Sequence, residues 1–469
     1  MDECHVVIVG GGFSGAALAV QLARHSEAPL RITLLEPRDL PGHGVAYSTP
    51  EPAHRINVPA ARMQLSESAE GDFDRWYRQQ PAFEQDTAAG TPDGAVWPQR
   101  AWFGRYVHQR LMEAVDKPGV AFSHLREHAV AQEQNAVITA SGQRLEADVV
   151  VLAVSHPPPA LPASLQALAD HPGVIANPWQ TSRFDDIGIT DRVAIIGTGL
   201  TMADVVASLG SRGHRGRVLA FSRRGLLPRA NLSGTFPDWS AEYSVSEAIS
   251  LRQWLARVRG DIRLAAEQGI PWQKVLDAVR HHGQDIWQSL PLREQQRFLR
   301  HLRSWWDVHR YRIAPQVAQE IAARRQRGEL DVRAARLEAA EEQGEQLRLF
   351  LRQRGGSATE LVVDRLVVTT GPAHGGLIDS QPLLRDLARH GIIQADALRL
   401  GLLVNQRSQT LNHAGEANPR LLVVGPAARG RFGELMGLPQ VADHAHTVAL
   451  EVLASLRQIT ASRCPVPQS

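Results

Sequence analysis

Two glycine-rich turns contain the residues whose spacing is most informative about chemistry. The first reads Gly10-Gly11-Gly12-Phe13-Ser14-Gly15 and follows the apolar run 6–9, which is typical of a strand buried on both faces. Gly10 permits a tight turn, Gly12 lets a pyrophosphate approach the backbone, and Gly15 lets the following helix pack on the strand. Free N–H groups at the start of the helix predicted over 16–23 then favour an anion.

Glu36 strengthens this interpretation, because it ends the next predicted strand, over 32–35. A carboxylate at that position can accept hydrogen bonds from both ribose hydroxyls of a dinucleotide. Strand, turn, helix and acid thus occur in the expected order. The sequence predicts a dinucleotide site formed by six residues: Gly10, Gly12, Phe13, Ser14, Gly15 and Glu36.

The second turn, Gly197-Thr198-Gly199, lies between a strand predicted over 193–196 and a helix over 200–209. Met202 occupies the third glycine position, so this copy departs from the strict G-x-G-x-x-G pattern. The strand predicted over 218–221 ends in Ser222-Arg223-Arg224 instead of an acid. A guanidinium can pair with a 2′-phosphate that a carboxylate would repel, so Gly197, Gly199, Arg223 and Arg224 predict an NADPH site. The alternative is that both arginines are solvated turn residues.

The rest of the chain fits a two-unit α/β protein. Further strands are predicted over 148–154, 364–369 and 421–424, and a last helix over 439–456. A proline-rich stretch at 157–162 is expected to form a crossover between domains. Between about 240 and 330 the pattern becomes helical, with Phe298, Leu302, Trp305 and His309 on one helical face. The fold class is therefore α/β with two Rossmann-type units and a helical insertion.

Composition restricts the classes of partner. The 469 residues include 51 Lys+Arg and 49 Asp+Glu, a net charge of +2 that favours neither nucleic acid nor an anionic membrane. Cys4 and Cys464 are the two cysteines of the sequence, so no thiol pair or zinc motif is predicted, and no metal site. The acidic start and the lack of a long apolar run predict a cytoplasmic location.

Seven segments together resemble the bacterial FAD/NAD(P)-binding proteins called YdhS-like, relatives of the class B flavin monooxygenases and N-hydroxylases. The resemblance covers nearly the whole chain. The segments are GGGFSG (10–15), GHGVAYSTPEPAHRINVPAARM (42–63), WPQRAWFGRY (97–106), GTGLTMAD (197–204), SRRGLLPR (222–229), HLRSWWDVHRYRIAP (301–315) and VVGPAARG (423–430).

The resemblance implies FAD in the first unit and a discontinuous FAD-binding domain, 1–160 and 371–469, with the NAD(P)H-binding domain 161–370 between its parts. Asn57 and Met63 are then expected near the flavin, and Arg100 and Tyr106 on a stretch bordering the cofactor. Val130 is expected to contact the adenine through its backbone, and Gly425 to meet the flavin end at the last helix.

The function favoured by this resemblance is FAD-dependent, NADPH-using oxidoreduction, with O2 oxygenating a nitrogen or sulfur of a small molecule. Class B monooxygenases carry an F-x-G-x-x-x-H signature before the second turn, where this chain has Asn177-Pro178-Trp179. Two alternatives therefore stay open. One is a flavin oxidase or dehydrogenase acting on an amine. The other is a nucleotide-binding redox sensor that uses the surface 305–312. Trp305 and Trp306 are expected to shape a lid that excludes water.

Overall fold

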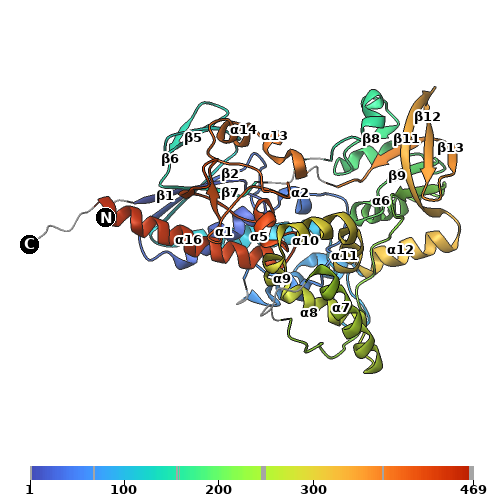
Figure 1. Cartoon of the computed structure of the whole chain (residues 1–469), viewed down its shortest axis with the longest axis horizontal. Coiled ribbons are helices and arrows are strands. Elements are labelled where there is room, and N and C mark those ends of the chain that lie inside the picture. The colour runs from blue at the N-terminus through green and yellow to red at the C-terminus, as the bar shows by residue number, and fades with distance from the viewer. Residues whose placement is uncertain are drawn as a thin grey trace, which may run out of the picture.

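A computed structural model of the chain describes residues 3–66, 69–154, 157, 159–243, 250–371 and 374–463. Two large sheets of the described chain lie on the left and right of Figure 1, and a third, small sheet has three strands. Cys464, and residue 158 of the proline-rich stretch at 157–162, lie outside the described residues. None of the described helices has both the length and the apolar character needed to cross a bilayer.

The first sheet combines the beginning and the end of the chain. Its order is β15-β16-β7-β1-β2-β3, and all neighbours run parallel except β15 and β16. The strands are β1 (Cys4–Val9), β2 (Leu30–Leu35), β3 (Val120–Leu125), β7 (Val149–Leu152), β15 (Gln409–Leu411) and β16 (Ala417–Val423). Their apolar side chains belong to two hydrophobic clusters, into which neighbouring residues of a strand alternate, as expected when both faces of a parallel sheet are covered.

Helices from distant parts of the sequence cover this sheet. α1 (Phe13–His25) and α16 (Gln440–Arg463) lie side by side in blue and red in Figure 1, and α5 (Arg100–Val115) packs on α1. A small antiparallel sheet of β4 (Ala129–Glu133), β5 (Ala136–Thr139) and β6 (Arg144–Glu146) carries α14 (Pro382–Arg389). The C-terminal segment is thus an integral part of the first unit.

The second sheet has the order β13-β12-β11-β10-β9-β14-β8. Its strands are β8 (Val174–Ile175), β9 (Val193–Ile196), β10 (Val218–Ser222), β11 (Leu330–Gln343), β12 (Gln346–Gln353), β13 (Ala358–Val363) and β14 (Arg365–Val368). β8 to β11 and β14 pair in parallel, whereas β11 to β13 form an antiparallel extension. α6 (Leu200–Ser211) follows β9 directly, and Met202 is fully buried in the core, so a methionine at the third glycine position is compatible with close helix packing.

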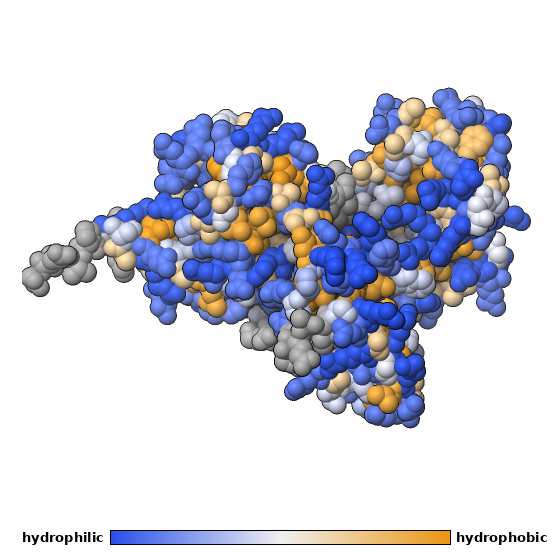
Figure 2. Space-filling view, viewed as in Figure 1, coloured by the Kyte–Doolittle hydropathy of each residue, from blue (hydrophilic) through white to orange (hydrophobic). Residues whose placement is uncertain are grey.

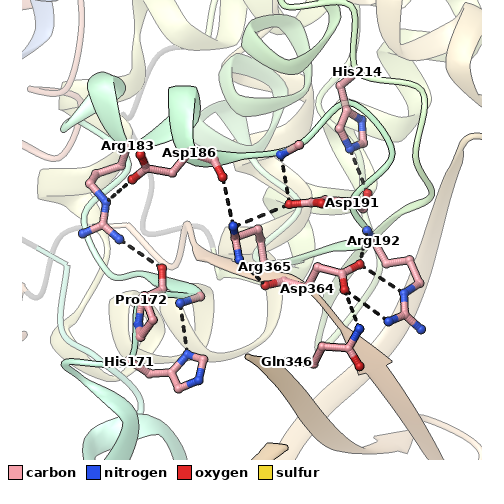
Figure 3. A network of polar contacts seen from close by, with 12 residues as sticks. His171, Pro172, Arg183, Asp186, Asp191, Arg192, His214, Gln346, Asp364 and Arg365 are labelled. Atoms are coloured by element: carbon pink, nitrogen blue, oxygen red, sulfur yellow. Dashed lines mark hydrogen bonds and ion pairs between the residues drawn. The ribbon is translucent and has the colours of Figure 1, made fainter. Parts of the chain in front are cut away.

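A polar network fixes the amino ends of β9 and β14, which are the ends away from the second glycine turn (Figure 3). Arg192 pairs with Asp364 at 3.1 Å, and Arg365 donates to the Asp186 carbonyl at 3.0 Å. Gln346 also donates to Asp364, at 2.8 Å. The ligand-binding edge of a parallel sheet is the carboxyl end of its strands, so this network at the amino ends has a structural role.

The helical insertion leaves the second unit after β10. It contains α7 (Leu251–Glu267), α8 (Trp272–His281), α9 (Gly283–Ser289), α10 (Leu292–Arg297), a π-helix (Phe298–Leu302) and α11 (Arg303–Arg310). The space-filling view shows it as a lobe below the junction of the two larger lobes (Figure 2).

One feature of the insertion differs from the sequence-based expectation. The helix α12 (Pro315–Gln326), expected within the insertion, instead packs on α6 and buries Val317 and Ile321 in the core of the second unit. It is the crossover helix that connects β10 to the parallel strand β11. The insertion itself packs against residues 430–440 of the first unit, where Trp287 donates to the Gly430 carbonyl at 3.0 Å.

Candidate functional site

The two glycine turns have the same backbone geometry. Gly10 has φ +107° and donates to the Leu35 carbonyl at 2.9 Å, and Gly197 has φ +113° and donates to the Phe221 carbonyl at 2.8 Å. A side chain on Gly10 would collide with the carbonyl oxygen of Ala153, and one on Gly197 with that of Thr369. The positive φ and the close approach together require glycine at both positions.

Each turn presents free N–H groups at the start of a helix. Gly12 precedes α1 and Gly199 precedes α6, both with extended backbone angles. The first N–H groups that bond back into these helices are those of Ala16 and Ala203. The preceding N–H groups form no backbone hydrogen bond within the described chain, and the space in front of Gly199 is open. Such helix starts are suited to an anion, and the binding of a pyrophosphate at either turn stays a prediction.

The carboxylate of Glu36 lies beside the first turn. It is 3% exposed and accepts hydrogen bonds from the Gly11 N–H at 3.0 Å and from the backbone and side chain of Arg38, each at 3.0 Å. A carboxylate has about four acceptor positions, so a ribose hydroxyl can still bind there. The site therefore fits the adenosine end of a dinucleotide.

The second turn has a neutral pair where the first has this carboxylate. These equivalent hydrogen bonds show which positions of the two turns correspond: Leu35 corresponds to Phe221. Glu36 therefore corresponds to Ser222, and Gly11 corresponds to Thr198. The Ser222 and Thr198 hydroxyls lie 2.8 Å apart. No carboxylate in this pair would repel a 2′-phosphate.

The two predicted arginines of the second turn differ in their contacts. Arg223 is exposed and makes no hydrogen bond or ion pair within the described part of the chain, so its guanidinium is available to a ligand. Arg224 is half-buried, and its Nη2 donates to the carbonyl of His301 in the π-helix at 3.2 Å. Arg224 therefore also connects the second unit to the insertion.

Gly425 is brought next to the first turn. A side chain on Gly425 would collide with the hydroxyl of Ser14. The Gly425 N–H donates to Nδ1 of His444 at 3.0 Å, and Nε2 of His444 lies 2.9 Å from the Ser408 hydroxyl. Because Nδ1 accepts, Nε2 carries the proton and donates. Burial lowers the pKa of His444 to about 3, so the ring stays neutral and holds the Gly425 backbone in place.

Sequence reasoning missed this role of His444. His444 and His446 are spaced so that their rings point apart on a helix, so the spacing alone indicates no shared site. The signal that could have identified His444 is its position on the inner face of the last helix, which only the packing of α16 on the sheet reveals.

Arg100 has contacts that the sequence did not indicate. It is buried, and its guanidinium makes a bidentate ion pair with Asp204 on α6 at 2.8 and 2.9 Å. Its Nε donates to the Arg55 carbonyl at 2.8 Å. Arg100 thus joins the first unit to the helix that follows the second glycine turn, and a contact with the cofactor stays a prediction.

The other predicted residues lie around the same region with fewer defined contacts. The Asn57 carbonyl accepts a hydrogen bond from Asn231 at 3.1 Å. Met63 and Tyr106 are buried in the core of the first unit, and the Tyr106 hydroxyl donates to Asp72 at 2.7 Å. Val130 lies in β4, five residues after Leu125, whose carbonyl accepts the Glu36 N–H. Phe13 stacks on Phe103 with ring centroids 5.7 Å apart.

Solved structures with the same fold are found over almost the full chain. The ornithine hydroxylase of Pseudomonas aeruginosa is 15% identical, with 97% of this chain and 100% of that chain covered and a TM-score of 0.64. The L-lysine 6-monooxygenase of Pseudomonas syringae is 18% identical, with coverages of 97% and 99% and a TM-score of 0.64. The ornithine N-hydroxylase of Kutzneria sp. 744, solved with reduced FAD, NADP+ and L-ornithine, is 17% identical, with coverages of 98% and 100% and a TM-score of 0.63.

The sequence comparison gives a more limited match. No curated protein is similar enough in sequence to count as a match. Residues 7–157, which contain the first glycine turn and Glu36, match the family model described as FAD-NAD(P)-binding. These residues therefore belong to an FAD/NAD(P)-binding domain, and the whole chain has the fold of the two-dinucleotide-binding-domain flavoproteins.

Proposed function

We propose that this protein is an FAD-dependent, NADPH-using monooxygenase that hydroxylates the nitrogen of a small amine. The observation that carries the proposal is the pair of glycine turns with different neighbours. The turn beside Glu36 suits FAD, and the turn beside Ser222 and Arg223 suits a nucleotide with a 2′-phosphate. The full-length likeness to ornithine and lysine hydroxylases, insertion included, supports the same reaction class.

The cysteine content favours O2 as the electron acceptor over a protein disulfide. The chain has two cysteines. Cys4 begins β1, whereas the glycine turn follows the other end of that strand, about 17 Å away at 3.3 Å per residue. Cys4 lies 3.4 Å from the Thr460 hydroxyl instead. A dithiol at the flavin, which a disulfide reductase requires, is not provided by Cys4.

The proposed reaction consumes one amine, one O2, one NADPH and one proton, and yields one hydroxylamine, one water and NADP+. FAD, when bound, carries the two electrons from NADPH to O2. The protein contributes position and electrostatics. The N–H groups at the starts of α1 and α6 bind the two pyrophosphates, Glu36 binds a ribose, and Gly425 allows the flavin end to approach α16.

The test uses purified holoprotein, NADPH and 18O2 with a panel of primary amines, followed by mass spectrometry. A hydroxylamine that carries one 18O atom, formed in proportion to NADPH consumed, supports the proposal. Stoichiometric hydrogen peroxide that no amine changes would establish the oxidase alternative. Flavin reduction by an amine but not by NADPH would establish a dehydrogenase, and slow NADPH oxidation with no product would favour the sensor.

We also infer how the chain is divided into an FAD-binding and an NAD(P)H-binding domain. The FAD-binding domain comprises 1–160 and 371–469, and the NAD(P)H-binding domain comprises 161–370 with the insertion. The strand orders of the two sheets support this division, because every strand of the first sheet falls outside 161–370. A cytoplasmic location and O2 as co-substrate belong to the same proposal.

A further inference from the structure

A cavity of about 610 Å³ lies within the helical insertion. This volume is in the range of small-molecule sites, roughly 300–1,000 Å³. Its walls come mainly from α7, α8, α9, the π-helix and α11 and are mostly aliphatic and aromatic. The aromatic wall residues are Trp254, Trp272, Trp287, Phe298, Trp305 and Trp306. Trp305 and Trp306, expected from the sequence to shape a lid, are thus part of this wall.

One end of the cavity is polar. Arg303, Asp307, Tyr311, Arg429 and Glu434 line it there. The carboxylate of Glu434 is engaged on both oxygens, by Trp306 Nε1 at 2.9 Å and by a buried arginine, Arg310, at 3.1 Å.

Asp307 is the less committed acid of the two. Its carboxylate lies 3.5 Å from Arg303, four residues earlier on the same helix, and its side chain is 40% exposed. A loose pair of that kind contributes little binding energy, so a ligand can replace it. Asp307 is therefore the acid in the cavity wall that can accept a cationic or hydrogen-bond-donating group.

Two chains of contacts place the polar end beside the proposed flavin position. Tyr311 is two residues before Ile313, and the side chain of Asn231 donates to the carbonyls of both Ile313 and Asn57, at 2.9 and 3.1 Å. Arg429 is four residues after Gly425, which lies against Ser14 of the first glycine turn. The apolar walls are formed by residues of the insertion.

A third contact connects the cavity wall to α16. Arg280 follows Val279, a wall residue of α8, and donates to the Leu438 carbonyl and to Gln440 Oε1. Gln440 is the first residue of α16. The wall is thus fixed directly to the segment at which the flavin end is expected.

We propose that this cavity is the substrate site and that it takes an amine carried on a bulky aromatic body, with the nitrogen at Asp307. The proposal rests on the proposed function and specifies its substrate class. Aromatic walls stabilise an apolar body because binding removes its surface from water. Away from the polar end the walls offer few hydrogen-bond partners, so the charged groups of an amino acid would lose hydration over most of the cavity.

Binding to the FAD-loaded full chain is measured by calorimetry and by tryptophan fluorescence, without NADPH. The probes are 4-phenylbutylamine, the neutral 4-phenylbutan-1-ol and L-ornithine. We expect 4-phenylbutylamine to bind at least about tenfold more tightly than L-ornithine and to change the fluorescence. Equal or tighter binding of L-ornithine would overturn the proposal.

Matched variants on α7 locate the site. Val258 lines the cavity, whereas Leu264 on the same helix is 50% exposed and does not line it. Val258→Trp fills the cavity and is expected to weaken 4-phenylbutylamine binding at least about tenfold, while Leu264→Trp leaves it unchanged. Equal affinities of these two variants would refute the location.

A more conservative variant tests the amine end. Asp307→Asn keeps the shape of the side chain and removes its charge. We expect it to weaken 4-phenylbutylamine binding about tenfold and to leave 4-phenylbutan-1-ol unchanged. An equal effect on both probes would exclude Asp307 as the amine partner.

Failure of this proposal and failure of the proposed function give different results. If the amine binds in the cavity but yields no hydroxylamine with NADPH and O2, the function is wrong and the site assignment stands. If hydroxylamines form while Val258→Trp and Asp307→Asn change neither binding nor KM, the function stands and the site assignment is wrong.

Discussion

The ion pair between Arg100 and Asp204 gives the sharpest test of how the two units are joined. Both side chains are nearly buried, 7% and 8% exposed, and two hydrogen bonds of 2.8 and 2.9 Å connect them. Arg100→Met removes the cation and leaves the Asp204 carboxylate buried without its partner. Breaking one side of a buried pair costs about 3–5 kcal/mol of unfolding free energy. The lost bond from Arg100 Nε to the Arg55 carbonyl adds about 1 kcal/mol.

The double variant Arg100→Met, Asp204→Leu separates this pair from a direct role of Arg100 in cofactor binding. Replacing both members of a buried pair with apolar residues of similar volume is often neutral or stabilising, so we expect most of the lost stability to return. Urea unfolding of the FAD-saturated proteins measures the unfolding free energy, and the four proteins form a double-mutant cycle. Fluorescence titration of the apoproteins measures FAD affinity in parallel.

The two interpretations give opposite results. If Arg100 acts through Asp204, then Asp204→Leu also destabilises the protein, and the double variant recovers both stability and FAD affinity. If Arg100 is a cofactor ligand, then Arg100→Met lowers FAD affinity while Asp204→Leu does not, and the double variant fails to recover it. A loss of FAD affinity in Arg100→Met with unchanged unfolding free energy would refute the structural reasoning.

Three further predictions concern the turns and the residue that supports them. Gly12→Asp places a carboxylate against the FAD pyrophosphate, so the purified variant should be folded by circular dichroism but colourless; a yellow, FAD-loaded variant would contradict the site. Changing Arg223 and Arg224 together to alanine should raise KM for NADPH by roughly 10- to 100-fold and leave that for NADH nearly unchanged; an equal change for both nucleotides would show that these arginines do not bind the 2′-phosphate. Because the pKa of His444 is lowered to about 3 in the folded protein, the unfolded chain binds a proton at this residue below about pH 6.5 while the folded chain does not. The stability from neutral His444 is thus complete above about pH 6.5 and is lost by up to about 1.4 kcal/mol per pH unit as the pH falls towards 3. The unfolding free energy of His444→Phe, measured against pH, should lack this component. An identical pH profile of the two proteins would contradict the prediction.

Local sequence was sufficient for the parts of the fold that depend on short-range geometry. The strand predicted over 193–196 is β9, Val193–Ile196, and the helix predicted over 200–209 is α6, Leu200–Ser211. Both glycine turns lie where the spacing of Gly10, Gly12, Gly197 and Gly199 placed them. The reason is that a tight turn, a free helix N-terminus and a buried parallel strand each restrict neighbouring residues to few types.

Residue spacing could not reveal contacts between segments far apart in the chain. Arg100 and Asp204 are 104 residues apart, and the Gly425 N–H meets His444 only because α16 folds back onto the first sheet. A buried arginine and a buried histidine have the same local sequence signature as exposed ones, since their partners come from other elements. These two residues acquire their roles from packing alone.

The insertion shows the same division between local pattern and tertiary contact. Its helical character, and the shared face of Phe298, Leu302, Trp305 and His309, followed from periodicity, and all four line one cavity in the structure. This face could have packed as a closed core, but in the structure it encloses a cavity against Glu434. The cavity depends on how the six helical segments of the insertion meet the segment 425–440 of another unit. Periodicity determines which side of a helix is apolar, whereas the tertiary structure determines what that side faces, because the facing surface is built from other parts of the chain.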